Sequence, residues 1–112
     1  MKRTVLLALV GMMGLPFLAA AETWKDVSVI DTQCVSKVKA DPDKHTTQCA
    51  LQCQRSGYGL LTAEGGYLKF DEDGNQKTLA ALKATKKTDH LRATVVGERN
   101  GETIKVTSIS IE

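Results

Sequence analysis

The stretch Leu91–Ile111 reads LRATVVGERNGETIKVTSISI and has the clearest structural pattern in the chain. Its apolar residues alternate with polar ones, as in strands with one buried face, at Leu91, Ala93, Val95, Ile104 and Val106. Asn100-Gly101 stands between the two halves, and this dipeptide is the strongest short signal for a tight hairpin turn. The alternation slips by one residue before the last two isoleucines. The stretch therefore predicts two antiparallel strands with a bulge near Thr107-Ser108.

The sequence before this hairpin contains three further strand patterns and one long helix pattern. Trp24–Ile30 is rich in β-branched residues and predicts the first strand. Tyr58–Thr62 and Gly66–Phe70 predict a second hairpin. Gln76–Thr85 has the alanine, leucine and lysine content of a helix, and Asp71–Asn75 is interpreted as a turn before it.

A cysteine-bearing segment separates the first strand from the second. Thr46–Ser56 suits a short helix, because Thr46 or Thr47 can cap its start and Gly57 can supply the left-handed residue that ends it. Five strands with the main helix between the third and the fourth form the OB-fold, a partly open five-stranded barrel. The sequence therefore predicts a mainly β fold with short helices, in which an OB-like barrel carries an inserted cysteine-bearing helix after its first strand.

The first residues have the features of a secretory signal peptide. Lys2 and Arg3 precede the uncharged apolar run Thr4–Leu18, and small residues at Ala19 and Ala21 form a cleavage signal. We expect residues 1–21 to be removed and residues 22–112 to form one OB-like domain, with no stable membrane insertion after cleavage.

Export determines the chemical setting of the expected domain. The protein would act in the periplasm or outside the cell, where thiols tend to oxidise. The chain carries 15 basic and 13 acidic residues, and Lys2 and Arg3 belong to the leader, so the remaining domain is neutral. A neutral exported domain has no electrostatic attraction for nucleic acid or for anionic membranes, and we expect neither as a partner.

Four short motifs are distributed along the expected domain. They are Asp31-Thr-Gln-Cys34, Cys49-Ala-Leu-Gln-Cys53, Gly57-Tyr-Gly-Leu-Leu61 and the closing hairpin Val95–Val106. Together they resemble a group of small exported bacterial proteins with an OB-like fold, most of them uncharacterised. The resemblance covers nearly all of the expected domain and implies a fold and an exported location, but no activity. Relatives in that group often have a histidine four residues after the first cysteine, where this chain has Val38.

The three cysteines, Cys34, Cys49 and Cys53, allow at most one disulfide within the chain. Cys34 could pair with Cys49 or with Cys53, and closing a loop of about 15 residues stabilises a domain by about 3 kcal/mol. A bridge between Cys49 and Cys53 would be strained on a helix. The third cysteine is expected to be a small buried apolar residue. We therefore expect one disulfide and one free thiol.

A second interpretation of the same residues is a metal site. His45, Cys49 and Cys53 follow one another at four-residue spacing, so they would form one stripe if the helix reached back to His45. Cys34 could approach this stripe and complete a Cys₃His set, which suits zinc, or copper as Cu(I). A haem-type group is a variant of this interpretation, and a redox-active thiol is a third one.

Three polar residues near the cysteines receive individual expectations. His45 is expected at the surface or at the start of the helix rather than as a ligand. Asp31 ends the first strand just before Cys34, where it could cap the following turn or orient a metal ligand. His90 is expected on the polar side of its strand and receives no role.

Three common motifs of catalytic and phosphate-binding sites do not occur in the sequence. It has no glycine-rich phosphate loop, no G-x-S-x-G and no H-E-x-x-H motif. We therefore expect a protein that is not an enzyme, a small exported binding or structural module of the bacterial envelope. It would be stabilised by a disulfide, need no cofactor and bind an unidentified small ligand or envelope protein. The alternative is a zinc- or copper-binding protein that uses Cys34, His45, Cys49 and Cys53.

Overall fold

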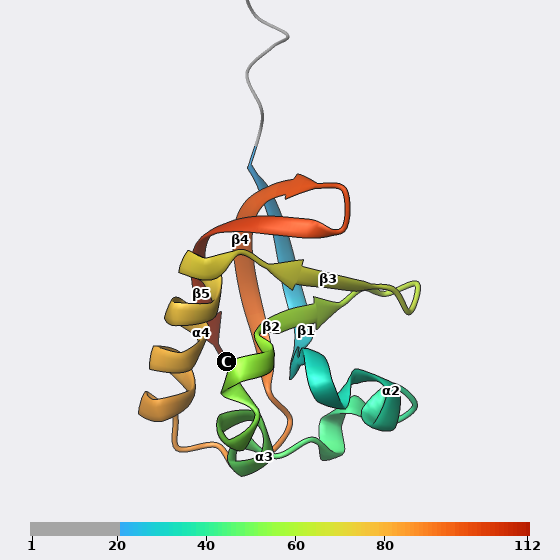
Figure 1. Ribbon diagram of the computed structural model, residues 1–112, viewed down its shortest axis with the longest axis vertical. Helices are drawn as coiled ribbons and strands as arrows, with labels where there is room; N and C mark the ends of the chain where they lie inside the picture. Colours follow the sequence, from blue (N-terminus) through green and yellow to red (C-terminus); the bar gives the residue numbers. More distant parts are fainter. Residues whose placement is uncertain (1–20) are drawn as a thin grey trace, which may run out of the picture.

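Figure 1 shows the computed structural model of the chain, which describes residues 21–112. The expected signal peptide therefore lies outside the described residues, apart from Ala21. The five strands are β1 (Glu22–Asp31), β2 (Tyr58–Leu61), β3 (Tyr67–Phe70), β4 (Arg92–Asn100) and β5 (Thr103–Ile111). The helices are α2 (Val35–Val38), α3 (Thr47–Gln52) and α4 (Glu72–Ala84), with 3₁₀ turns η1 (Thr32–Cys34), η2 (Pro42–Lys44) and η3 (Gln54–Ser56).

The strands close into a barrel in the order β1-β2-β3-β5-β4. All neighbouring pairs are antiparallel except β3 and β5, which run parallel. The long α4 helix lies between β3 and β4 in the chain, as the OB topology requires. The predicted fold class is thus confirmed, including the cysteine-bearing α3 inserted after β1.

The closing hairpin has the predicted bulge, but its two-residue turn is Gly101-Glu102, one residue later than Asn100-Gly101, because Asn100 pairs with Thr103. Val96 pairs with Ser108 and Gly97 pairs with Val106, so Thr107 is the extra residue of β5. Gly101 adopts a φ of 69°, which the tight turn requires. Gly97 lies so close to the partner strand that an added Cβ would stand 2.4 Å from the carbonyl oxygen of Lys105. The bulge and this close approach bend the hairpin so that the barrel can close.

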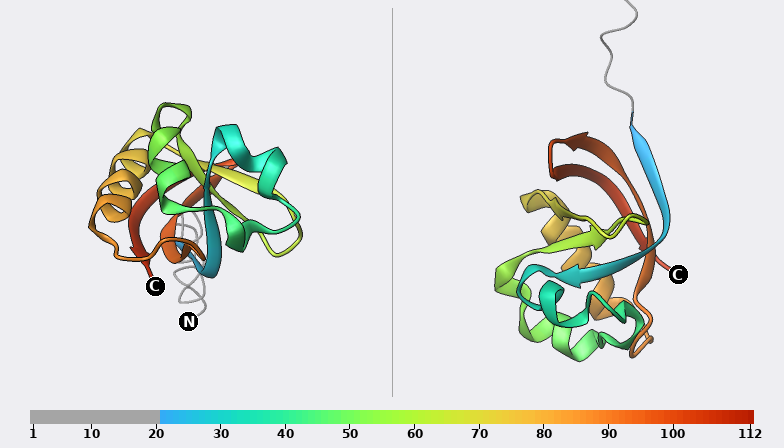
Figure 2. Two further views of the ribbon diagram at one scale, coloured as in Figure 1. Left: turned by 90° about the horizontal axis from the view of Figure 1, so that it is seen from below. Right: turned by 90° about the vertical axis from the view of Figure 1, so that its right-hand side faces the viewer.

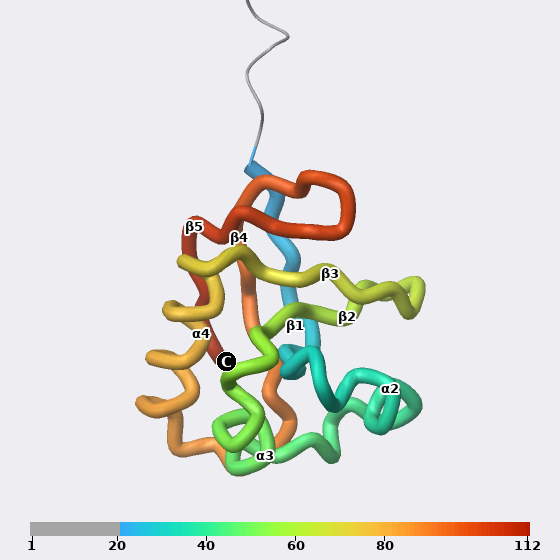
Figure 3. Tube along the Cα trace, viewed as in Figure 1, coloured from blue at the N-terminus to red at the C-terminus, as the bar shows by residue number. Residues whose placement is uncertain are grey.

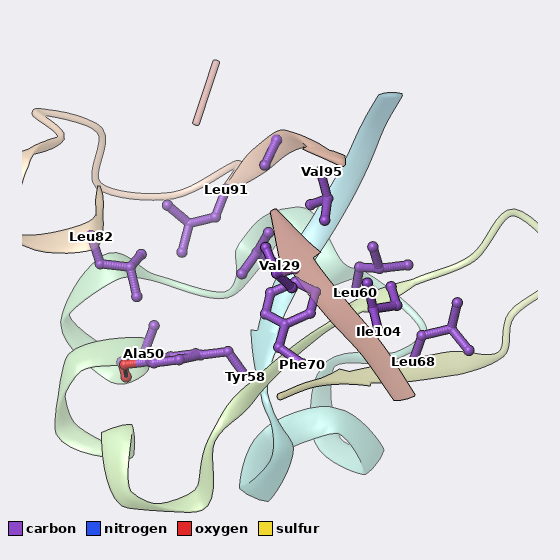
Figure 4. Packing of buried hydrophobic residues seen from close by; sticks show 12 residues of the cluster. Val29, Ala50, Tyr58, Leu60, Leu68, Phe70, Leu82, Leu91, Val95 and Ile104 are labelled. Atoms are coloured by element: carbon purple, nitrogen blue, oxygen red, sulfur yellow. Dashed lines mark hydrogen bonds between the residues drawn. The ribbon is translucent and has the colours of Figure 1, made fainter. Parts of the chain in front are cut away.

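The interior of the barrel is filled by apolar side chains from all five strands and two helices. Figure 4 shows this cluster, in which Phe70 lies close to Val29 and Tyr58 extends towards Ala50 of α3. The fully buried members of the core include Ile30, Leu60, Ala93, Val95 and Ile104. None of the helices in residues 21–112 combines the length and the apolar character that a transmembrane helix needs.

The helix before the closing hairpin begins earlier than predicted. Asp71–Asn75 is not a turn, because Asp71 caps α4 by accepting a hydrogen bond from the Gly74 N–H at 2.9 Å. Acidic Glu72 and Asp73 in the first turn suit the helix dipole. Gly74 signals close packing rather than a turn, since an added Cβ would stand 2.5 Å from a methyl group of Val106.

The cysteine-bearing excursion lies at the lower end of the barrel, away from the β4–β5 turn, in Figures 1 and 3. The predicted cap is present, because the Thr46 hydroxyl accepts a hydrogen bond from the Cys49 N–H at 3.1 Å. Gly57 follows η3 with a φ of 81°, as predicted. The short helical segments η1, α2 and η2 were not predicted, because their sequence has no clear apolar period.

Candidate functional site

Asp31 ends β1 directly after a buried run of the strand and is itself completely buried. Its Oδ2 accepts a hydrogen bond from the Cys34 N–H at 3.1 Å and so caps η1. One of the two roles expected for Asp31, the cap of the following turn, is therefore confirmed. The position is unusual for an acidic residue, because burying a carboxylate requires compensating partners.

His45 provides the second contact of this carboxylate, and the expectation of a surface histidine was wrong. Its side chain is 2% exposed, and its Nε2 lies 2.8 Å from Asp31 Oδ1. Neither of these two atoms has a well-aligned hydrogen bond with any group of residues 21–112. His45 reaches Asp31 because η2 ends just before it, with the His45 N–H donating to the Pro42 carbonyl at 3.1 Å.

Two of the three cysteines lie beside Asp31. Cys34 ends η1 and Cys53 follows the last residue of α3. Asp31, Cys34 and Cys53 each offer one atom that could bind a metal, and these three atoms lie within 4.8 Å of one another. We call these three residues the Asp-Cys cluster. In the right-hand view of Figure 2, the helical segments between β1 and β2 gather at one end of the barrel. All three cysteines of the chain are free thiols in the structure.

The remaining cysteine, Cys49, is exposed, which corrects the expectation of a buried spare thiol. The predicted stripe of His45, Cys49 and Cys53 does not form, because α3 begins only at Thr47 and His45 is extended. Within the described residues, neither His45 nor Cys49 joins a group of three ligand atoms at this spacing. The structure thus brings together Cys34 and Cys53 of the predicted Cys₃His set and adds Asp31.

The Cys34 thiol is held in its protonated form. Burial, the hydrogen bond to Asp31 and the negative charge of that carboxylate raise the pKa of Cys34 to about 12. The nucleophilic species of cysteine is the thiolate, so this environment is the opposite of the one that activates a catalytic cysteine. The arrangement of the site therefore gives no support to a redox-active or nucleophilic Cys34.

Two tyrosines close the barrel end above the cluster. The Tyr58 hydroxyl donates to the Ala50 carbonyl at 2.8 Å, which ties α3 to β2. The Tyr67 hydroxyl donates to the Ile30 carbonyl at 2.8 Å, one residue before Asp31. Burial, with smaller contributions from the charges of Asp31 and Cys53, raises the pKa of Tyr58 to about 12. Tyr58 thus acts as a hydrogen-bond donor that positions α3, and Tyr67 as one that positions the end of β1.

A second candidate site is a groove on the face that carries the β2–β3 turn. Two depressions of about 360 Å³ each share Lys25, Val27, Thr62 and Ala63, and a third of about 340 Å³ continues past Thr62 and Arg99 to Glu102. We call this surface the front groove. Beyond Lys25 it reaches the loop after α2, at Lys39 and Pro42. It therefore connects the β1–β2 excursion with the β4–β5 turn, and Figure 1 shows both on the same side as the β2–β3 turn.

The front groove is lined mainly by the start of β1 and the β2–β3 turn, and it reaches β2 and β3 at Leu61, Tyr67 and Leu68. In this fold the ligand face extends across strands 2 and 3 between the loop after strand 1 and the loop after strand 4. The groove carries basic Lys25, Lys39 and Arg99 together with acidic Asp26 and Glu64. Sequence reasoning did not single out these residues, because their types are ordinary and only the closing of the barrel brings them together.

One wall of the front groove is fixed by an ion pair between Arg92 and Asp43. Arg92 Nε lies 2.8 Å from Asp43 Oδ1, and its Nη2 donates to Asp43 Oδ2 at 3.0 Å. Arg92 also lies 3.1 Å from Asp26 Oδ1. The hydrogen bond and charge of Arg92 lower the pKa of Asp43 below the ordinary value of an aspartate. The pair therefore attaches the excursion to β4.

We predict that Asp43→Asn lowers the free energy of unfolding at pH 7 by about 1 kcal/mol, because one partner of a largely covered bidentate pair is lost. A carboxyl group whose pKa is lower in the folded protein than in the unfolded chain stabilises the fold at pH values above its unfolded pKa. This contribution disappears as the pH falls through the folded pKa. Urea unfolding of both proteins from pH 7 to pH 2.5 should therefore show the difference shrinking below pH 3.8. A difference that stays constant with pH would contradict this assignment.

Comparisons of the chain with protein-family models, with curated proteins and with solved structures give no match.

Proposed function

We propose that the protein is a small exported binding module of the bacterial envelope, which takes a small ligand or a segment of an envelope protein in the front groove. The signal-peptide pattern of residues 1–21 supports export. The observation that supports the binding role is that three neighbouring depressions, all lined by Thr62, lie between Pro42 and Glu102. OB-folds bind their ligands across strands 2 and 3, and the depressions reach these strands at Leu61, Tyr67 and Leu68.

The proposal includes a disulfide between Cys34 and Cys53 in the exported protein. Their sulfur atoms are already neighbours, whereas Cys49 is exposed and outside the Asp-Cys cluster. The Cys53 thiolate would attack an oxidant disulfide such as oxidised glutathione, form a mixed disulfide and release one glutathione thiolate. Cys34 would then lose its proton and displace the second glutathione thiolate, so that two thiols are oxidised and one disulfide is reduced.

The role of this disulfide is structural. It would attach the start of the excursion, at η1, to the end of α3. Pro42 lines the groove, and Cys34 precedes Pro42 in the same excursion. The disulfide would therefore hold the groove wall at Pro42 in place. A fixed wall reduces the conformational entropy that ligand binding would otherwise cost.

Nuclear magnetic resonance of the oxidised domain tests the binding role. The probes are soluble peptidoglycan fragments and the low-molecular-weight fraction of the bacterial envelope. We expect at least one probe to shift amide resonances of Lys25, Thr62 and Arg99. Ala63→Glu, which adds a charged side chain at an exposed position of the groove, should weaken binding by about 10-fold or more without changing the fold.

The matched control is Ala80→Glu, the same substitution at an exposed position of α4, away from the groove. It should leave the shifts of the wild-type protein unchanged. Shifts that map to α4, or equal weakening by both substitutions, would contradict the proposal. The absence of shifts with either probe would contradict it as well.

A further inference from the structure

We infer that the reduced protein binds one zinc ion at the Asp-Cys cluster, through Cys34 Sγ, Cys53 Sγ and a carboxylate oxygen of Asp31. This inference does not depend on the ligand of the front groove. It concerns the thiol form of the two cysteines that the exported protein would otherwise join in a disulfide.

The spacing of the donor atoms is the first argument. The three ligand atoms lie within 4.8 Å of one another. In a tetrahedral zinc site, with Zn–S near 2.3 Å and Zn–O near 2.1 Å, neighbouring donor atoms are about 3.4–3.8 Å apart. Cys34 and Cys53 are both partly exposed and follow short helical turns, so small side-chain rotations can close this gap.

The state of the buried polar atoms is the second and independent argument. Asp31 is completely buried, and its Oδ1 has no well-aligned hydrogen bond in the described residues although His45 Nε2 is 2.8 Å away. Among the ion pairs of residues 21–112, the partner of Asp31 is His45, and no lysine or arginine contacts this carboxylate. Because burying a carboxylate is costly, a cation held beside it by Cys34 and Cys53 would stabilise Asp31 in its buried position.

His45 would then have a defined function without being a ligand. Carboxylates that bind metals are usually held by a further hydrogen bond, which fixes their orientation. Here His45 contacts Asp31 Oδ1, and the Cys34 N–H donates to Oδ2. Each carboxylate oxygen therefore has one neighbour that fixes the orientation of the side chain. We therefore assign His45 as the residue that positions Asp31, which differs from the ligand role considered from the sequence.

The donor set selects the metal. Calcium and magnesium require oxygen ligands, whereas two thiolates with one carboxylate oxygen suit zinc. The expected mature domain has no methionine, the thioether that would favour Cu(I). The fourth position of the zinc ion would be taken by water. Binding requires both sulfurs as thiolates, so a Cys34–Cys53 disulfide and the zinc ion exclude each other.

The experiment measures zinc bound to the mature domain in two redox states. The protein is reduced with a phosphine or oxidised with oxidised glutathione, then titrated with Zn²⁺ and, as a control, Ca²⁺. Bound metal is counted by native mass spectrometry, and cobalt(II) substitution gives visible absorption characteristic of tetrahedral thiolate coordination. We expect one zinc per reduced chain, none per oxidised chain and no calcium in either state.

Variants separate this site from other possibilities. Cys53→Ser should lower zinc affinity by at least about 100-fold, and His45→Gln by about 10–100-fold. Cys49→Ser, which changes the exposed thiol outside the cluster, should bind zinc as the wild type does. Circular dichroism verifies that each variant is folded. If His45→Gln fails to fold, the comparison of Cys49→Ser with Cys53→Ser alone tests whether zinc binds at the Asp-Cys cluster.

Three results would overturn the inference. One is a reduced wild type that binds no zinc. Another is loss of binding in Cys49→Ser with binding kept in Cys53→Ser. The third is equal zinc binding by the oxidised and reduced proteins. None of these results changes the groove shifts of the oxidised domain, so failure of this inference is distinguishable from failure of the proposed binding function.

Discussion

Asp31→Ala is expected to lower the free energy of unfolding by about 2–4 kcal/mol, because it removes the cap of η1 and the partner of the buried His45 side chain. The substitution removes the cap of η1 and leaves the imidazole of His45, which is 2% exposed, facing an apolar methyl group. Chemical denaturation at neutral pH measures the change. Because Asp31 lies between β1 and the excursion, the loss should affect the whole domain rather than one loop.

The chain contains a matched control for this prediction. His90 Nδ1 and Asp89 Oδ1 are also 2.8 Å apart, but their side chains are 60% and 51% exposed. Asp89→Ala should therefore change the free energy of unfolding by less than about 0.5 kcal/mol. Equal losses for Asp31→Ala and Asp89→Ala would show that burial of the first pair does not determine its contribution.

Oxidation of Cys34 and Cys53 to a disulfide is expected to stabilise the domain by about 3 kcal/mol. The bridge closes a loop of about 20 residues and reduces the entropy of the unfolded chain. Urea unfolding of the oxidised protein, with and without reductant, measures the difference. The difference should disappear in Cys53→Ser and remain in Cys49→Ser. A wild-type protein that is equally stable with and without reductant would contradict the prediction.

The strands were predictable because their signals are local. Alternation around Asn100-Gly101, together with the slip before Ile109, was enough to predict the hairpin and the bulge at Thr107. The start of α4 was not predicted, because Asp71 and Gly74 are residues of turns as well as of helix caps. Only the packing of Gly74 against Val106 distinguishes the two possibilities.

The buried pair of Asp31 and His45 could be predicted only in part. The position of Asp31 between the buried Val29-Ile30 run and Cys34 indicated a cap, and this signal is local. The burial of His45 depends on η2 and on the path of the excursion, which has no apolar period in the sequence. A polar residue becomes buried through tertiary contacts, which the types of its neighbours in sequence do not specify.

The partner of Cys34 was left open by the sequence for a similar reason. Cys49 and Cys53 are one helical turn apart, so a continuous helix would present both on the same side. The structure distinguishes them because α3 ends at Gln52, and the chain then turns through η3 towards β2. Cys53 thereby reaches Asp31 and Cys34, while Cys49 stays exposed.

Disulfide mapping of the exported protein tests the Cys34–Cys53 disulfide of the proposed function most directly. The protein is isolated under conditions that block free thiols, digested without reduction and analysed by mass spectrometry. We predict a linked pair of peptides that contain Cys34 and Cys53, and a blocked thiol at Cys49. A disulfide that includes Cys49, within the chain or between chains, or three blocked thiols in the exported protein, would contradict this account.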